Sequence, residues 1–302
     1  RLDTIVPYTD PGPKNPLRAA FEKMSPDIAG RDAIVAEADR LITTQMVPAY
    51  AQLLDFMRKE YVPNATKSVS ARDLPGGLAF YQDRIRYHTT LDLTADEIHA
   101  IGLKEVARID ADMQKTMADA GFKGTFPEFL AFLRSDPRFY AKTPEELLHY
   151  VAWINKKMDG KLKDVLGLLP RYRYTIKPVP DSIAPIYTSG RGGLEACWFN
   201  TYDLPQRPLY NLTSLALHEC NPGHSLQAAL ALEGPDRPDF RRETYFSGYG
   251  EGWALYTEWL GTKIGMYETP YDEFGRETFE MWRAARLVID TGIHAKGWSR
   301  QQ

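Results

Sequence analysis

The run HECNPGH at residues 218–224 constrains the fold of this chain more than any other feature. In a regular helix of 3.6 residues per turn, His218 and His224 would stand about 120° apart around the axis and about 9 Å apart along it. Pro222 removes a helical hydrogen bond, and Gly223 accepts unusual backbone angles. The sequence therefore predicts an interruption between the histidines that brings His224 back beside His218.

These residue types are the ones that a zinc hydrolase needs. Neutral imidazoles bind zinc, and an adjacent carboxylate can take a proton from the water that the metal activates. His218 and His224 are therefore candidate ligands, and Glu219 is the candidate general base. Glu251, which opens the run EGWALY, is the candidate third ligand. Two histidines and one glutamate form a catalytic zinc set with one coordination position open for water.

Alternatives remain open at the sequence level. The standard motif H-E-x-x-H places its histidines four residues apart, about 40° around a helix. With the two histidines six positions apart, the first helix could simply end at Asn221 while His224 caps the next one. Glu258 is a rival for the third ligand, or a partner that fixes the tautomer of a ligand histidine. Glu243 is a weaker rival.

Composition narrows the class of protein. Of 302 residues, 43% are hydrophobic and 25% are charged, which is ordinary for a soluble globular protein of one or two domains. The net charge is -3 and no basic stretch stands out, which argues against a nucleic-acid partner. No apolar run approaches the roughly 18 residues of a membrane span. Nothing in the sequence sets the oligomeric state.

Cysteine usage and the chain ends leave the compartment open. Cys197 and Cys220 are the two cysteines, too few for a disulfide framework. We expect two small buried thiols; the alternative is a pair, if a strand carrying Cys197 lies against the helix carrying Cys220. The chain begins at Arg1 without an initiator methionine and ends just after a patterned run, so both ends look cut. Any lipid anchor would precede Arg1.

Residues 1–168 read as a succession of helices. Apolar residues recur at helical spacing from Arg31 to about Glu60, where Pro48 should kink or split the helix. Thr94 and Glu97 form a capping box that opens a helix expected to reach Ala120. Further helices are expected over residues 78–89, 125–133 and 143–166.

Residues 169–302 add a small sheet to more helices. Alternating strand formers predict short strands over residues 172–176, 184–188 and 196–201, with a flexible loop at 190–193. Helices are expected over residues 210–221, 224–232, 249–264 and 271–297. The fold class is therefore mainly α (α+β), with a small antiparallel or mixed sheet beside the motif helix. We expect the regions 1–168 and 169–302 to form one continuous unit.

The small sheet could hold an extended peptide by adding it as a strand. The segment formed by Phe199, Asn200 and Thr201 is the candidate edge for such a substrate.

Three motifs together resemble a bacterial family long catalogued as a domain of unknown function and often described as lipoproteins. The family looks like zincin metallopeptidases of the glutamate-ligand type, akin to carboxypeptidase Taq and the oligopeptidases. Dipeptidyl peptidase III is a related precedent, because its motif carries one extra residue between the histidines and still binds zinc. The matching residues are HExxPGHxxQ at 218–227, EGWALYxE at 251–258, RAxRLVxDTGxH at 283–294, LPGG at 74–77, Tyr81 and the segment 94–106.

The resemblance implies a zincin-like helical peptidase fold and one Zn²⁺ per chain. It also implies hydrolysis of short peptides and a periplasmic or cell-envelope location, with the cytoplasm as the alternative. Members of the family usually extend beyond both ends of this chain, so this sequence would be a fragment.

Further residues are candidates for catalysis or substrate binding. His294 and Tyr249 are candidate donors to the negatively charged oxygen of the transition state, and Tyr245 is an alternative that also qualifies as a substrate contact. Arg283 and Arg286 could hold the C-terminal carboxylate of a peptide, as in a carboxypeptidase or dipeptidase, or could form structural salt bridges.

Two other functions compete with a zinc peptidase. One is a non-catalytic periplasmic binding or scaffold protein with a degenerate metal site. The other is a metallohydrolase for a non-peptide amide or ester.

Overall fold

The computed structural model describes residues 2–302, with the exception of the side chain of Glu243. The chain forms two compact units, Arg1–Val69 and Ser70–Gln302. The expected regions 1–168 and 169–302 divide the chain by secondary-structure type, and this division falls inside the second unit.

The first unit is a helical segment whose long helix is widened at two places. The helices are α1 (Ala19–Glu22), α2 (Arg31–Leu41), α3 (Val47–Phe56) and α4 (Val62–Asn64). A π-helical turn at Ile42–Met46 joins α2 to α3 immediately before Pro48. Because proline has no N–H and clashes with the preceding turn, a wider turn accommodates it. The helix therefore continues through Pro48 in a widened form and does not split in two there.

The second unit begins with four helices that match the expected ranges closely. They are α5 (Gly77–Thr89), α6 (Ala95–Asp119), α7 (Phe126–Ser135) and α8 (Pro144–Val165). The capping box of α6 is confirmed. The backbone N–H of Glu97 donates to Thr94 Oγ1 at 3.2 Å, and the N–H of Thr94 donates to Glu97 Oε2 at 2.8 Å. These two bonds satisfy amides that the first turn of a helix leaves free.

The sheet has three short strands in the order β1-β3-β2. β1 (Thr175–Pro178) runs parallel to β3 (Ala196–Phe199), and β2 (Gly190–Arg191) runs antiparallel to it. The strand expected over residues 184–188 is wrong, because Ala184–Ile186 forms a 3-10 turn with Pro185 in it. Proline cannot donate to a strand ladder, which disfavours a strand there. Conversely, part of the loop expected at 190–193 is strand β2.

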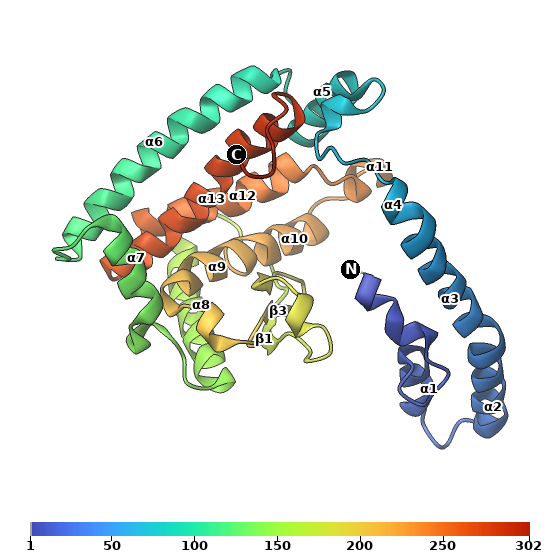
Figure 1. Cartoon of the computed structure of the whole chain (residues 1–302). Helices are drawn as coiled ribbons and strands as arrows, with labels where there is room; N and C mark the ends of the chain where they lie inside the picture. The colour runs from blue at the N-terminus through green and yellow to red at the C-terminus, as the bar shows by residue number, and fades with distance from the viewer. Residues whose placement is uncertain (1) are drawn as a thin grey trace. The chain divides into compact units, whose positions relative to one another are not determined.

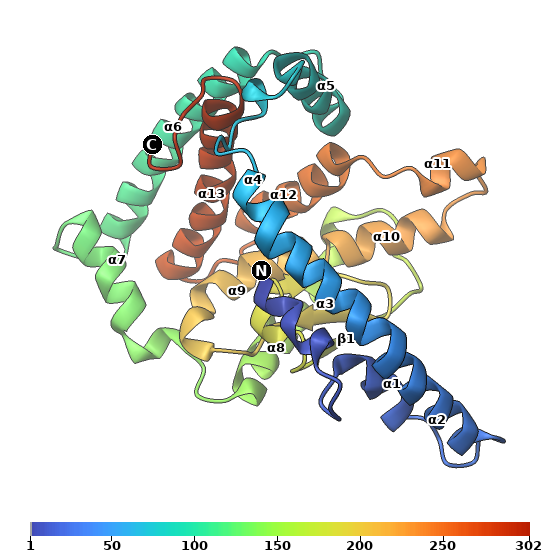
Figure 2. The ribbon, with the colours of Figure 1, turned by 45° about the vertical axis from the view of Figure 1, so that its right-hand side comes forward.

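Five helices complete the second unit: α9 (Leu212–Glu219), α10 (His224–Glu233), α11 (Asp239–Glu243), α12 (Ser247–Lys263) and α13 (Pro270–His294). Figures 1 and 2 both show α13 running alongside α6, and these two helices form the most extensive helix pair of the chain. The mainly helical class with a small mixed sheet is confirmed.

Two hydrophobic clusters hold the second unit together. One is rich in aromatic rings and joins α6, α7 and α13, with Phe129 and Phe274 at its centre. The other joins α8, the sheet, α9 and α10, and includes the fully buried Phe199 and Leu217. Helix α9 is therefore packed on several sides, so that its C-terminal end is held in place within the unit.

Cys197 of β3 and Cys220 at the end of α9 form a disulfide. The expectation of two free thiols is wrong, and the alternative pairing is the one observed, because β3 does lie against the end of the motif helix. Both cysteines are fully buried. Among the described residues, no helix is long and apolar enough to cross a membrane.

Candidate metal site

The interruption predicted between the histidines is present. Helix α9 ends at Glu219, residues 220–223 form a tight loop with a cis peptide before Pro222, and α10 begins at His224. A Cβ on Gly223 would lie 1.8 Å from the carbonyl oxygen of His218, so only glycine fits where the loop returns. The two imidazole rings meet edge to face, with centroids 4.8 Å apart. His224 thus begins a new helix and still faces His218.

Glu251 of α12 faces both histidines. Its carboxylate oxygens lie 3.4 Å from His218 Nε2 and 3.6 Å from His224 Nε2. In a tetrahedral zinc site with bonds of about 2.0–2.1 Å, donor atoms are about 3.3 Å apart. These two separations are therefore close to those of ligands around one ion, and one ligand atom from each of the three residues lies within 4.8 Å of the others. Within the described part of the chain, this is the one group of three His, Cys, Asp or Glu side chains arranged to hold a metal.

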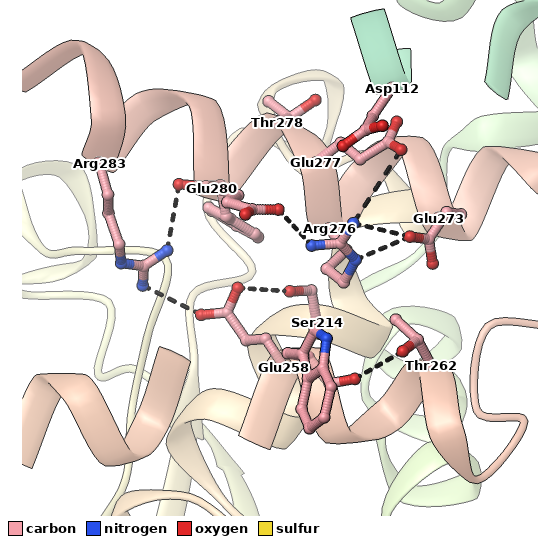
Figure 3. Close-up of polar contacts among 12 residues, drawn as sticks. Asp112, Ser214, Glu258, Thr262, Glu273, Arg276, Glu277, Thr278, Glu280 and Arg283 are labelled. Atoms are coloured by element: carbon pink, nitrogen blue, oxygen red, sulfur yellow. Dashed lines mark hydrogen bonds and ion pairs between the residues drawn. The ribbon is translucent and has the colours of Figure 1, made fainter. Parts of the chain in front are cut away.

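Glu258 lies behind His218 rather than among the ligands. Its Oε1 accepts from His218 Nδ1 at 2.6 Å and from Arg283 Nη2 at 3.1 Å, while Ser214 Oγ donates to its Oε2 at 2.9 Å. Figure 3 shows the contacts of Glu258 with Ser214 and Arg283. Because an ionised carboxylate only accepts, the proton of His218 is assigned to Nδ1 and its Nε2 is left for a metal.

The expected role of Glu258 as a tautomer-fixing partner therefore agrees with the geometry, and its role as third ligand does not. The side chain of Glu243, the weaker rival, lies outside the described residues.

Electrostatics at the site favour a positive charge between the carboxylates. Burial lowers the pKa of His218, but its contacts with Glu251 and Glu258 outweigh burial and raise it to about 9. The interaction with His218 lowers the pKa of Glu251, whereas burial and the charge of His218 lower that of His224. Without a metal, a proton on His218 supplies positive charge between Glu251 and Glu258; a bound cation would take its place.

Glu219 lies at the junction of the motif helix and the sheet. Its Oε2 accepts from the backbone N–H of Gly192 at 2.7 Å, immediately after β2. Burial raises the pKa of Glu219 above its usual value and outweighs the nearby charge of His218. A carboxylate with a raised pKa next to a metal site is suited to accept and release a proton.

The predicted substrate edge is wrong. Phe199 belongs to β3, the central strand, and is fully buried. Asn200 is 1% exposed, and its amide donates to the carbonyl of Ala184 at 2.8 Å, so it serves the loop beneath the sheet. Thr201 follows directly and forms no edge either. The edge strand beside α9 is β2, which lies within the residues expected to form a flexible loop.

Of the candidate residues on α13, Arg283 contacts the metal site, whereas His294 and Arg286 do not. Arg283 reaches the back of His218, with its Nη2 3.0 Å from Nδ1. His294 lies eleven residues further, about 16 Å along the helix. Its Nδ1 accepts from the backbone N–H of Ala71, so the expected transition-state role of His294 is not supported. Arg286 stacks on Trp282 and does not take part in the Glu258 contacts.

The two candidate tyrosines also differ in their surroundings. Tyr249 is 69% exposed in the first turn of α12. Tyr245 precedes α12, and its ring edge lies against Gly250, next to Glu251.

The fold and this donor set define a mainly helical protein with a candidate metal site between α9, α10 and α12. The chain belongs to the family described as bacterial protein of unknown function (DUF885), which matches residues 2–302. This confirms the expected family; the likeness to zincin peptidases stays a prediction.

One solved structure that the chain resembles is the crystal structure of a protein from Colwellia psychrerythraea described as a "putative lipoprotein". The two are 31% identical, with a TM-score of 0.86 over 95% of this chain. The match covers 51% of the other chain, so this chain spans about half its length. No match was found among curated proteins.

Sequence reasoning missed three features of the site. Ser214 lies four residues before His218, so both side chains are on one face of the helix. This spacing could have identified Ser214 as a residue near the site. Gly192 contacts Glu219 from a different element, so no local signal reveals it. The disulfide was considered but not favoured, because two cysteines alone give no evidence of proximity.

Proposed function

We propose that this protein is a zinc-dependent hydrolase of peptide bonds in short peptides. The observation that carries the proposal is the convergence of His218, His224 and Glu251, with Glu258 aligning His218 from behind. Two imidazoles and one carboxylate are a ligand set that zinc enzymes use, and imidazole nitrogen suits zinc. The charge distribution agrees, since the site attracts a positive charge in the absence of a metal.

When bound, zinc would polarise the substrate carbonyl and lower the pKa of water. Glu219 would take the proton of the attacking water and pass it to the leaving nitrogen. The N–H of Gly192 orients one carboxylate oxygen of Glu219 and leaves the other free to exchange a proton. Glu258 and Arg283 would keep His218 in one orientation throughout.

The edge strand β2 supports an extended peptide as the substrate. It lies beside α9, and the next residue, Gly192, contacts the proposed base directly. A peptide that adds to β2 as a further strand would run past Glu219 with its backbone hydrogen-bonded to the sheet. The substrate would then be recognised through its main chain, which suits short, flexible peptides.

Metal content and a single-atom change of the base test the proposal. We expect about one zinc per chain, which a chelator removes. Glu219→Gln should keep zinc, because the ligands are intact, and should lower peptide hydrolysis at least 10²-fold, because an amide cannot act as a base. Glu145→Gln, at an exposed glutamate of α8, is the matched control and should change neither quantity. Full activity in Glu219→Gln would remove this residue from the mechanism.

Glu251→Ala should act differently, because it removes a ligand and should weaken zinc binding. A wild-type chain without zinc would instead support the non-catalytic binding protein. Zinc binding with hydrolysis of esters or non-peptide amides alone, in a substrate panel, would support the other metallohydrolase.

For the location, we propose the cell envelope. The similar protein from Colwellia psychrerythraea is described as a lipoprotein, and disulfides such as Cys197–Cys220 persist mainly in oxidising compartments such as the periplasm. Cell fractionation with an antibody against the chain tests this; recovery only from the cytoplasm, with free thiols, would contradict it.

A further inference from the structure

The position of Tyr245 points to a further catalytic residue, an inference that rests on the proposed hydrolysis. A Cβ built on Gly250 would lie 2.1 Å from the Tyr245 hydroxyl oxygen and 2.4 Å from Cζ. The phenol end of the ring, rather than its base, therefore lies directly against the backbone of Gly250. Since Gly250 immediately precedes the candidate ligand Glu251, the hydroxyl lies against the turn of α12 that carries this ligand.

This hydroxyl makes no hydrogen bond to any residue that the structure describes. Two more deeply placed tyrosines of the second unit are bonded: Tyr81 donates to Asp290 at 2.6 Å, and Tyr267 donates to the carbonyl of Glu258 at 2.8 Å. The side chain of Tyr245 is 62% exposed although its tip lies against α12. Its hydroxyl is therefore available to a molecule that enters the site from solvent.

Burial and then the surrounding charges shift the pKa of this hydroxyl upward. Partial burial raises the pKa of Tyr245, and the negative charges of Glu251 and Glu219 raise it further. Both carboxylates are thus close enough to Tyr245 to act on it, which agrees with the contact at Gly250. A phenol that holds its proton at neutral pH is a hydrogen-bond donor.

We propose that Tyr245 is the catalytic residue that donates a hydrogen bond to the carbonyl oxygen of the scissile bond as this oxygen gains negative charge. In that step the water oxygen bonds to the carbonyl carbon while its proton moves to Glu219. The carbon–nitrogen bond then breaks, and the nitrogen receives the proton from Glu219. Tyr245 keeps its own proton throughout and strengthens its hydrogen bond only in the transition state.

Gly250 is the positioning residue in this arrangement. Any side chain there would occupy the place of the Tyr245 hydroxyl, so Gly250→Ala should push the ring away without altering a ligand. Alanine favours a helix more than glycine does, so this change is compatible with folding of α12. The variant therefore tests the position of the hydroxyl separately from its presence.

The experiment compares Tyr245→Phe, Gly250→Ala and the control Tyr87→Phe, at an equally exposed tyrosine of α5, with the wild type. We expect Tyr245→Phe to lower kcat about 10²–10³-fold, as for loss of one donor to a developing oxyanion. KM and zinc content should stay unchanged. A phosphinic peptide, which imitates the transition state, should bind more weakly by a similar factor in calorimetry. Gly250→Ala should reproduce both losses, whereas Tyr87→Phe should reproduce neither.

The outcomes separate this inference from the function on which it rests. A wild type that binds zinc but hydrolyses no peptide would overturn the proposed function and this role together. A wild type that is active, with kcat and phosphinic-peptide affinity unchanged in Tyr245→Phe, would overturn this role alone. Loss of zinc in Tyr245→Phe would also overturn it, because Tyr245 would then support the ligands.

Discussion

Helix α13 carries two arginine–carboxylate networks of similar composition, one turned toward α9 and α12 and the other toward α6 (Figure 3). In the first, Arg283 and Ser214 both contact the buried Glu258. In the second, Arg276 contacts Glu273 and Glu280, and Glu277 accepts from Thr116 of α6 at 2.9 Å. Each network places acidic side chains in the interior of the second unit.

The networks differ in how completely the acidic groups are satisfied. Both oxygens of Glu258 accept hydrogen bonds, and one of these comes from the metal-facing His218. Glu277 has one oxygen without a partner among the described residues, although it is 3% exposed. Burial raises the pKa of Glu277 to about 7. A buried carboxylate therefore indicates function only through what it bonds to, and we expect the first network to serve metal binding and the second to serve folding.

The largest effect is expected for Arg276→Met. The side chain of Arg276 is 10% exposed and neutralises Glu273 and Glu280. Removing one partner of a buried ion pair leaves uncompensated charge, which costs about 3–5 kcal/mol. Urea unfolding of the metal-free protein should show this loss, whereas zinc affinity measured by chelator competition should not change. A weakened zinc affinity would show that the two networks are coupled. It would contradict the assignment of the second network to folding alone.

Glu277→Gln should stabilise the protein, in a manner that depends on pH. The pKa of Glu277 is about 7 in the folded chain against 4.5 as its ordinary value. The folded state therefore binds the extra proton, and the stability that Glu277 contributes is complete below pH 4.5 and lost as the pH rises through 7. Because glutamine resembles the protonated acid, the variant should exceed the wild type by about 2–3 kcal/mol at pH 8 and match it near pH 4.5.

Glu280→Gln is the control of opposite sign. Burial raises the pKa of Glu280, but hydrogen bonds from Arg276 and Arg108 outweigh burial and hold it below its ordinary value. This group contributes stability above its unfolded pKa, which is lost as the pH falls through its folded pKa. The change should therefore destabilise at pH 8 and lose its effect in acid. Parallel pH curves for the two variants would contradict the opposite pKa shifts of Glu277 and Glu280.

Local patterns predicted much of the helical fold. The capping box at Thr94 and the helical spacing after it depend on residues within one or two turns, and α6 begins where these signals place it. The sheet was harder, because short strands are defined by their partners. Whether Gly190–Arg191 is a loop or a strand depends on its pairing with Trp198 and Phe199, which no local pattern contains.

Prediction of the candidate site has the same limit, because contacts between distant elements are not contained in local patterns. The loop between His218 and His224 could be predicted because Pro222 and Gly223 lie within it and have strong backbone preferences. The different fates of Arg283 and His294 could not, since both lie in the same motif and on the same helix. What separates them is the neighbour that each meets, Glu258 of α12 for Arg283 and Ala71 for His294.

The remaining two predictions concern the first network and have the smallest expected effects. Glu258→Gln keeps the size of the side chain and an oxygen that can accept from His218, but removes the charge that Arg283 and His218 share. Loss of such a partner behind a ligand histidine typically costs 10–100-fold in metal affinity, which corresponds to about 1.4–2.7 kcal/mol. Chelator competition measures this loss directly.

Ser214→Ala should weaken zinc binding less than Glu258→Gln does. It tests whether the charge or the orientation of Glu258 governs this binding. It removes only the hydrogen bond to Glu258 Oε2 and leaves the charge of Glu258 and its contact with His218 intact. If the charge beside His218 governs zinc binding, Ser214→Ala should weaken it by about fivefold, as for one ordinary hydrogen bond, and much less than Glu258→Gln does. Equal losses would mean that the orientation of Glu258 matters more than its charge. No loss in either variant would mean that the first network, like the second, serves folding.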